Sequence, residues 1–449
     1  MRRPTGAVRG ERPRRTHEGE GEKDMGEPPT MTSAAADPAA LARAHASLNA
    51  AHPGARAFWF TDLDAVRASA DHLKYHLKSL RPRLHYALKA NGLPAIARTL
   101  REAGLGADAG SLGELELARA CGFPAGGRTL SGNGRTPEEA EWVVRHGVEA
   151  VSADLPGELD LLERIAARAG SRLRVALRVN PGIVAGGHRG IETGHAATKF
   201  GMSVRQALEV WRAPGRWPHL ELDGVHTHVG SQVSDVASYV AAARLALDLV
   251  AGCARAGHAL TSVNLGGGFA VGYDGEPGFD PAALATALLE LPRASTVEWC
   301  FEPGRWLVAS AGTLVAEVLW DKRRDDPEGE RRFVVLAAGM NDFLRPALYG
   351  ARHRIAPLVP REGPVTPADV VGPVCESSDT FVTGVPLPPL EPGDLVALLD
   401  AGAYGSVMAS AYNGRPSLAQ VVSSRGEFLV VAGPGAPASA SGGGVPLAG

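Results

Sequence analysis

A repeated alternation of short apolar strands with helical segments is the feature that most constrains the fold of this chain. Between residues 84 and 302, eight short apolar runs are separated by stretches rich in Ala, Leu, Glu and Arg. Such alternation is typical of a parallel sheet, and eight units favour a closed (β/α)8 barrel over an open doubly wound sheet. The predicted strands are Leu84–Lys89, Gly106–Ala109, Arg128–Ser131, Ala150–Ala153, Leu173–Val179, Gly224–Val229, Ser262–Leu265 and Val297–Glu302.

After about residue 313 the alternation gives way to strands separated by turns and Pro-rich loops. This pattern predicts a C-terminal antiparallel β domain behind a TIM-like barrel. We expect the barrel to span 62–312, and the β domain to combine 36–61 with 313–432. The predicted strands of the β domain are 57–60, 313–320, 332–336, 369–374, 394–399 and 427–432.

The two ends of the chain differ from the rest in composition. Residues 1–35 are mostly Arg, Glu, Gly, Pro and other small residues, and residues 433–449 are mostly Gly, Ala, Ser and Pro. Segments that bury so little apolar surface are predicted to be disordered.

Composition narrows the classes of partner and location. The net charge of -3 gives no electrostatic reason to expect nucleic acid or an acidic membrane as a partner. No apolar run approaches the roughly 20 residues of a membrane-spanning helix. The four cysteines form no CxxC pair, which favours a reducing, cytoplasmic location and gives no zinc site.

A single lysine, Lys89, ends the first predicted strand of the barrel. An ammonium in an apolar setting is costly unless its pKa falls or its nitrogen is bound covalently. Both outcomes suit a Schiff-base lysine. The alternative is a lysine that extends from the strand end to bulk water.

Glycines follow the seventh and eighth predicted strands, where barrel enzymes often hold phosphate. The seventh strand leads into Gly266-Gly267-Gly268, and the eighth into Glu302-Pro303-Gly304-Arg305. Exposed backbone N–H groups of the glycine turn, together with Arg305, can bind an anion. Tight turns alone also explain the glycines.

A lysine and a phosphate site at the same end of a barrel indicate pyridoxal 5'-phosphate. This cofactor needs a carboxylate beside its ring nitrogen to act as a strong electron sink, and Glu302 is the candidate. A surface ion pair between Glu302 and Arg305 is the alternative.

Two histidines lie near the end of the sixth predicted strand. Alternation along a strand points His226 and His228 to the same face, into the barrel mouth. They could bind zinc, but we find no convincing set of further ligands. Stacking of His228 on an aromatic cofactor, with Ser231 reaching its phosphate, fits better. Asp108, in the second predicted strand, is expected either to orient a neighbouring side chain or to cap the next helix.

Taken together, six motifs occur in the order of a known family. They are Tyr86–Asn91, His228–Gln232, Gly266–Phe269, Glu302–Arg305, Gly372–Ser377 and Asp400–Gly405. This set resembles the alanine-racemase-like, fold-type III group of pyridoxal-phosphate decarboxylases, and within it the diaminopimelate decarboxylases.

The resemblance implies a role for each matching residue. Lys89 would form the Schiff base with the cofactor, and His228 would stack on its ring. The phosphate would be bound by Ser231, Gly266, Gly267, Gly268, Gly304, Arg305 and Tyr404, with Asp108 also near the cofactor. Glu302 would pair with the ring nitrogen, where racemases carry an arginine. Cys375 from the partner subunit of a homodimer with shared active sites would donate a proton.

The resemblance also implies a substrate, meso-2,6-diaminopimelate, which would lose CO2 to give L-lysine. Arg305 and Arg345 would hold the distal carboxylate, whereas substrates such as ornithine have none to hold. Glu376 would bind the distal ammonium, and Tyr349 and Tyr404 would line the site. An interdomain salt bridge is the alternative role for Arg345.

Some segments depart from the common wording of the family, among them Phe58–Asp62, Asp108–Glu114 and 185–194. They leave two alternatives open. One is a related decarboxylase of specialised metabolism, and the other is a non-catalytic homologue that binds the cofactor. A complete catalytic set, including Cys375, argues against the second.

Overall fold

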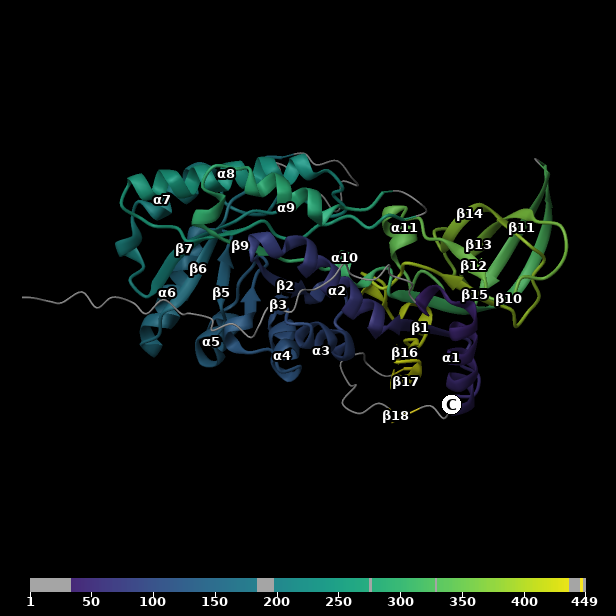
Figure 1. Cartoon of the computed structure of the whole chain (residues 1–449). Coiled ribbons are helices and arrows are strands. Elements are labelled where there is room, and N and C mark those ends of the chain that lie inside the picture. The colour runs from purple at the N-terminus through teal and green to yellow at the C-terminus, as the bar shows by residue number, and fades with distance from the viewer. Residues whose placement is uncertain (1–33, 184–197, 274–276, 328, 436–444, 447–449) are drawn as a thin grey trace, which may run out of the picture.

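Eight parallel strands close into a barrel, which forms the left half of the molecule in Figure 1. This computed structural model describes residues 34–183, 198–273, 277–327, 329–435 and 445–446. Pairing of Leu84 with Phe301 joins the first strand to the last, which confirms the predicted (β/α)8 barrel. The strands are β2 (Arg83–Ala87), β3 (Gly106–Ala109), β4 (Arg128–Leu130), β5 (Ala150–Ala153), β6 (Leu173–Arg178), β7 (Leu220–His226), β8 (Ser262–Asn264) and β9 (Glu298–Phe301).

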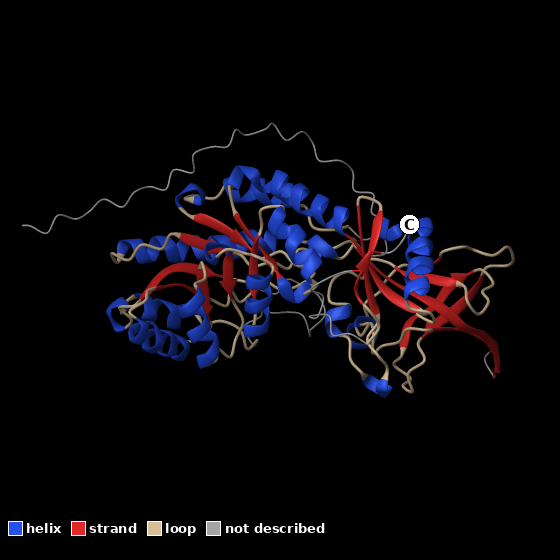
Figure 2. Cartoon of the chain, turned by 90° about the horizontal axis from the view of Figure 1, so that it is seen from below, coloured by secondary structure: helices blue, strands red, loops and turns tan. Residues whose placement is uncertain are grey.

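Helices surround the barrel, as the views in Figures 1 and 2 show. Several begin at side chains that satisfy free backbone N–H groups; Thr136 and Glu139 form the capping box of α5. The helices are α2 (Leu63–Leu77), α3 (Pro94–Glu102), α4 (Leu112–Ala120), α5 (Pro137–His146), α6 (Pro156–Ala169), α7 (Val204–Trp211), α8 (Val236–Arg255), α9 (Pro281–Leu289) and α10 (Arg305–Val308).

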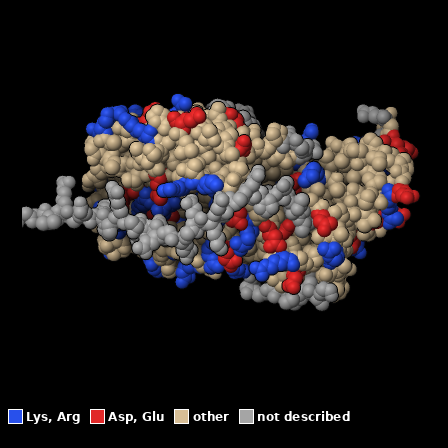
Figure 3. Space-filling model, in the orientation of Figure 1, with Lys and Arg blue, Asp and Glu red and all other residues tan. Residues whose placement is uncertain are grey.

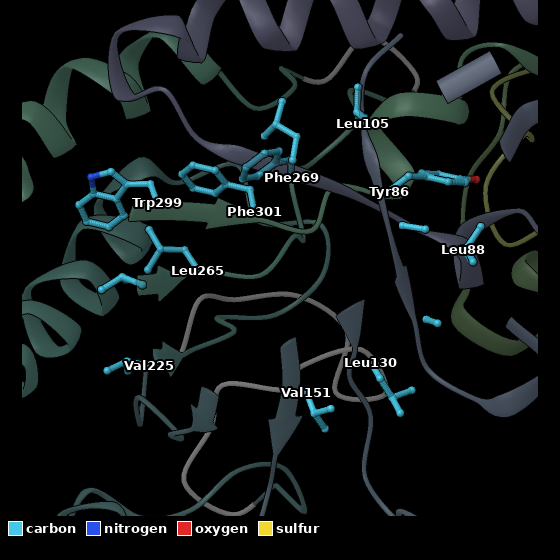
Figure 4. Packing of buried hydrophobic residues seen from close by; sticks show 14 of the residues in the cluster. Tyr86, Leu88, Leu105, Leu130, Val151, Val225, Leu265, Phe269, Trp299 and Phe301 are labelled. Carbon is cyan, nitrogen blue, oxygen red and sulfur yellow. The ribbon is translucent and has the colours of Figure 1, made fainter. Parts of the chain in front are cut away.

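Side chains alternate along the barrel strands between an apolar outer layer and a polar interior. Val225 and Phe301 belong to the buried apolar layer, part of which Figure 4 shows. Their neighbours His226 and Glu302 are also buried, but they contact polar groups of other strands. Because polar side chains from several strands meet inside one barrel, they can form a common site.

A second sheet forms the β domain. It is mainly antiparallel, but it is not purely so as predicted: β1 runs parallel to β16, and β11 runs parallel to β13. The prediction also missed β12, β14 and β16. The strands are β1 (Ala57–Asp62), β10 (Gly312–Asp326), β11 (Gly329–Leu336), β12 (Ile355–Pro357), β13 (Thr366–Val371), β14 (Thr380–Leu387), β15 (Leu395–Leu398), β16 (Ala419–Ser424), β17 (Glu427–Ala432) and β18 (Val445–Pro446).

Two helices belong to the β-domain side, α1 (Pro38–Ala51) and α11 (Arg345–Tyr349). The predicted disordered ends lie mostly outside the described residues. Their described parts differ from the prediction, because Ala34–Ala36 form a short 3-10 helix and β18 pairs with β17.

Loops of the β domain bond directly to the loop that follows β2. The Tyr404 N–H donates to Ala90 O at 2.7 Å, and Asn91 Nδ2 donates to Gly402 O at 2.9 Å. In Figure 1, α11 lies between the barrel and the strands of the β domain. The carboxyl ends of the barrel strands therefore face residues of the β domain.

Helix α8 corrects the expectation that no apolar run is long enough to span a membrane. It has 20 residues and the required mean hydropathy, although it contains Arg244 and Asp248. Because 56% of its most apolar 18-residue stretch is buried, and because it packs on β7, β8 and α9, α8 covers the outside of the barrel.

The surface shown in Figure 3 carries both signs of charge. Positive and negative side chains are interspersed on this face.

Candidate active site

A cavity of about 460 Å³ opens at the carboxyl ends of the barrel strands. Residues of both the barrel and the β domain line it. The predicted site residues that line the cavity are Lys89, His228, Ser231, Gly267, Gly268, Glu302, Gly304, Arg305, Arg345, Tyr349 and Tyr404. Asp108, Gly266, Cys375 and Glu376 are not among its lining residues.

Lys89 projects into this cavity from the single 3-10 turn Leu88–Ala90 that follows β2. Its side chain is surrounded by protein but reaches the solvent of the cavity. Burial alone would lower the pKa of Lys89, yet Asp108, Tyr404 and Glu302 nearby outweigh it, so the pKa is raised. Of the two outcomes expected for Lys89, a lowered pKa or a covalently bound nitrogen, the lowered pKa is not found, and the covalent bond stays a prediction.

Glu302 is buried, with 6% of its surface exposed. Asn264 Nδ2 donates to Glu302 Oε1 at 2.7 Å, and Glu302 Oε2 lies 3.6 Å from His226 Nε2. Among the described residues Glu302 makes no ion pair with Arg305, so the alternative of a surface pair is wrong. Asn264 fixes one carboxylate oxygen and leaves the group facing the cavity.

The two histidines near the end of β7 both line the cavity, as strand alternation predicts. Ser152 Oγ lies 2.8 Å from His226 Nδ1. Burial, with Arg178 nearby, lowers the pKa of His226 to about 3 and that of His228 well below its usual value. Both rings are therefore neutral at physiological pH, and His228 can present an uncharged aromatic face.

Asp108 lies inside the barrel, almost completely buried. It accepts a hydrogen bond from Thr129 Oγ1 at 3.3 Å, whereas Ser111 caps α4. The helix-capping alternative for Asp108 is therefore wrong. Burial and the neighbouring Glu302 raise the pKa of Asp108, while Lys89 opposes them.

The glycine turn after β8 leaves no room for side chains. A Cβ at Gly267 would overlap Glu302 O, and a Cβ at Gly268 would overlap Gly230 O; Gly268 also has a φ of +92°. Among the described residues, the N–H groups of Gly267 and Gly268 have no hydrogen-bond partner. The turn therefore offers the cavity two backbone donors.

Two arginines border the same cavity, one from each domain. Arg305 donates through Nη2 to Ser231 Oγ at 3.0 Å, and its guanidinium lies 4.7 Å from the centre of the Tyr404 ring. Arg345, at the start of α11, contacts Tyr273 and no carboxylate in the described part of the chain. The alternative role of Arg345 as an interdomain salt bridge is therefore wrong.

Cys375 and Glu376 lie outside the cavity of their own chain. Both are exposed on the loop between β13 and β14; the Cys375 N–H donates to Asn413 Oδ1 at 3.3 Å, and Tyr412 donates to Glu376 at 2.7 Å. A single chain therefore does not bring these two residues together with Lys89.

The structure adds residues that the sequence analysis did not single out. Arg178, at the end of β6, and Glu114, which accepts from the Gly110 N–H at 2.6 Å, both line the cavity. The strand-end rule that identified Lys89 would also have found Arg178. No pattern in the sequence marks Tyr273 or His353; Tyr273 contacts Arg345 and His353 across the two domains.

The cavity has the chemical groups that pyridoxal 5'-phosphate requires. Two free backbone N–H groups, the unpartnered Arg305 Nε and the Ser231 hydroxyl suit a phosphate. Lys89 supplies an amine, Glu302 a carboxylate, and His228 a ring whose Nδ1 has no partner. The donor set thus fits the cofactor.

Comparisons with known proteins agree with this chemistry. Residues 63–309 match the family described as "Pyridoxal-dependent decarboxylase, pyridoxal binding domain". Diaminopimelate decarboxylase of Zymomonas mobilis is 38% identical over 350 residues, which are 77% of this chain and 82% of that protein.

Solved structures extend the comparison to both domains. Helicobacter pylori diaminopimelate decarboxylase complexed with L-lysine has a TM-score of 0.82 and 34% identity, over 87% of this chain and 97% of that one. Lysine/ornithine decarboxylase of Vibrio vulnificus has a TM-score of 0.73 and 25% identity, over 85% of this chain and 98% of that one. The chain therefore belongs to the diaminopimelate decarboxylase family of pyridoxal-dependent decarboxylases.

Proposed function

We propose that this protein removes CO2 from the D-centre of meso-2,6-diaminopimelate and releases L-lysine, the last step of lysine biosynthesis, in the cytoplasm. The observation that carries the proposal is one cavity in which Lys89, Glu302, a glycine turn and two arginines converge. Family membership supplies the cofactor, pyridoxal 5'-phosphate.

The cofactor would be held at its two ends. Lys89 would bind it covalently, while Ser231, the Gly266–Gly268 turn, Gly304 and Tyr404 would hold the phosphate. When bound, the cofactor supplies an electron sink for the pair of electrons that the departing CO2 leaves behind. Glu302 would keep the ring nitrogen protonated, and the neutral His228 would pack on the ring.

The far end of the substrate would be recognised by charge. Arg345, together with Arg305, binds the distal carboxylate, because an arginine donates two parallel hydrogen bonds to a carboxylate. Tyr349 and Tyr404 also line the cavity. A substrate without a distal carboxylate would leave Arg345 buried and unpaired, and it would therefore bind less tightly.

A homodimer would complete each site. Cys375 and Glu376 are exposed and lie outside the cavity of their own chain, so we assign them to the cavity of the partner subunit. There Cys375 delivers the proton that replaces the lost carboxylate, and Glu376 binds the distal ammonium.

The function is tested by incubating the holoenzyme with meso-diaminopimelate and measuring CO2 and L-lysine. We expect turnover and a visible cofactor band that borohydride removes. Lys89→Ala should abolish both turnover and the covalent band. Release of CO2 from another amino acid but not from diaminopimelate would contradict the proposed substrate; an unchanged band in Lys89→Ala would contradict the role of the lysine.

Shared sites are tested by mixing two inactive variants, Lys89→Ala and Cys375→Ala. If each cavity uses Lys89 of one subunit and Cys375 of the other, a mixed dimer contains one intact site. Equal mixing should then restore about a quarter of wild-type activity. No recovery after subunit exchange, verified with differently tagged chains, would refute the assignment of Cys375 to the partner.

A further inference from the structure

A chain of hydrogen bonds joins the two arginines of the cavity. Arg305 Nη1 donates to the Tyr273 hydroxyl at 3.3 Å, and Arg345 Nη1 donates to the same oxygen at 3.2 Å. A tyrosine oxygen has two acceptor positions, so one hydroxyl can bind both guanidinium groups. Tyr273 therefore fixes the separation of two cations that would otherwise repel each other.

His353 holds Arg345 from the other side. Arg345 Nη1 lies 3.0 Å from His353 Nε2, and His353 Nδ1 lies 3.0 Å from Leu399 O. Because a carbonyl can only accept, Nδ1 carries the proton and Nε2 accepts from Arg345. Burial and the charge of Arg345 lower the pKa of His353 to about 3, which keeps it neutral and able to accept.

All of these groups are buried and tightly packed. Tyr273 is 8% exposed, His353 6% and Arg345 5%. The Arg345 guanidinium lies 5.1 Å from the centre of the Tyr273 ring, and the His353 ring packs edge-on against both Tyr273 and Phe343. Long arginine side chains lose much rotamer freedom on binding, so a side chain that is already fixed binds an anion more tightly.

The contacts use only part of the Arg345 guanidinium. In the described part of the chain, both of its hydrogen bonds start from Nη1. The Nη2 and Nε donors remain for a ligand in the cavity that Arg345 lines. Tyr273 and His353 themselves do not line that cavity, so their effect on a ligand passes through the arginine.

We propose that Tyr273 and His353 are positioning residues that hold Arg345 ready for a distal carboxylate and so set the preference for a dicarboxylic substrate. This inference rests on the proposed function and adds the residues that make Arg345 selective. Tyr273 belongs to the barrel and His353 to the β domain, so the preference depends on the packing of one domain against the other.

The experiment compares Tyr273→Phe, His353→Leu and His353→Gln, each loaded with cofactor. Loss of a hydrogen bond to a charged group predicts a rise of about tenfold in the KM for diaminopimelate, with kcat changed much less. His353→Gln retains an acceptor and should recover part of the loss. D-lysine has the same reacting centre without the distal carboxylate, so its KM should stay near the wild-type value in all three variants.

A binding measurement separates this inference from the proposed reaction. Pimelate, a dicarboxylate without amino groups, is titrated calorimetrically into wild-type and variant holoenzyme. We expect its Kd to rise about tenfold in Tyr273→Phe and His353→Leu. This readout remains valid even if wild-type protein releases no CO2 from diaminopimelate, a result that would refute only the proposed function.

A matched control is His258→Leu. His258 Nε2 also contacts a backbone carbonyl, Leu222 O at 2.7 Å, but lies outside the cavity lining. The His258→Leu variant should have the wild-type KM for diaminopimelate and the wild-type Kd for pimelate. Three results would each overturn the inference. One is an equal rise in KM for diaminopimelate and D-lysine. The others are an unchanged pimelate Kd in both Tyr273→Phe and His353→Leu, and no binding of pimelate by the wild type.

Discussion

The two ends of the barrel use charged side chains in opposite ways. At the amino ends of the strands, Arg83 contacts Glu298 at 2.6 Å and Glu149 at 2.9 Å, while His85 contacts Glu149 at 3.0 Å. Each carboxylate there faces a cationic or hydrogen-bonding partner. At the carboxyl ends, in the described part of the chain, Lys89 forms no ion pair although it shares the cavity with Glu302.

This difference separates stability from binding. Paired charges at the amino end are satisfied by the fold itself, so they can stabilise it without a ligand. The carboxyl end retains unpartnered atoms, among them His226 Nε2, His228 Nδ1 and Arg305 Nε. Unsatisfied buried groups cost free energy, which a ligand with complementary groups recovers. Unpartnered atoms also lie at the amino end, at His85 Nδ1 and in the Arg128 guanidinium, but only those of His226, His228 and Arg305 belong to residues that line the cavity, where a cofactor and substrate would bind.

The largest expected effect comes from Glu302→Gln at the carboxyl end. Glutamine can still accept from Asn264, but it does not keep a ring nitrogen protonated, so kcat should fall by about a hundredfold. The melting temperature should not fall, because Glu302 is one of two neighbouring buried carboxylates. Steady-state kinetics and thermal unfolding check both statements. A lower melting temperature with an unaltered kcat would show that Glu302 serves stability and not catalysis, contrary to the role assigned to the carboxyl end.

An intermediate effect is expected from Glu149→Gln at the amino end. The Glu149 side chain is only 8% exposed and contacts both Arg83 and His85, so its neutralisation should cost about 2 kcal/mol of unfolding free energy. Because the residue lies outside the cavity, kcat and KM should stay at wild-type values. Urea unfolding with two probes gives the stability, and a parallel assay gives the activity.

The same variant predicts a pH dependence. Burial opposes ionisation of Glu149, but His85 and Arg83 outweigh it and lower its pKa. A lowered carboxyl pKa stabilises the fold above the unfolded value of about 4.3, and this contribution is lost as pH falls through the lower folded value. The difference between wild type and Glu149→Gln should therefore shrink below about pH 4. A difference that grows on acidification would contradict the assignment.

The smallest effect is expected from Glu298→Gln, a match for Glu302→Gln on the same segment of chain. Its side chain is 34% exposed, and its contacts with Arg83 and Arg174 are partly screened by solvent. We expect Glu298→Gln to lower the free energy of unfolding by less than about 1 kcal/mol and to leave the activity unchanged. A loss of activity comparable with that of Glu302→Gln would show that the two ends of the barrel are not functionally separate.

Local patterns predicted much of the fold. The eight barrel strands were found because short apolar runs end at polar residues with regular spacing, as in Gly106–Ala109 and Ala150–Ala153. The β domain was predicted less completely. β14 pairs with the preceding strand β13 and was missed because Gly384 and Pro386 interrupt its apolar pattern, whereas β16 pairs with the distant β1. Two parallel pairs were also missed, because strand direction depends on which distant strand lies alongside.

The candidate site followed the same division. Strand-end position and glycine spacing identified Lys89, Glu302 and the turn at Gly266–Gly268, all of which are local signals. The raised pKa of Lys89 could not be predicted, because the groups that cause it, Asp108, Tyr404 and Glu302, come from segments far apart in the chain. Tyr273 was missed because its arginine partners lie 32 and 72 residues away, and His353 because its contacts with Arg345 and Leu399 O follow from the folded loop and not from a local pattern.

The sequence by itself determined the barrel, the order of its motifs and the family to which the chain belongs, because those depend on residues close together in the chain. Only the tertiary structure decided which charges face one another, which atoms remain unpartnered, and that Cys375 lies outside its own cavity. The physical reason is that electrostatic and hydrogen-bond energies depend on distance in space. Closure of the barrel brings distant parts of the chain into contact, such as Arg83 and Glu298, which are 215 positions apart in the sequence.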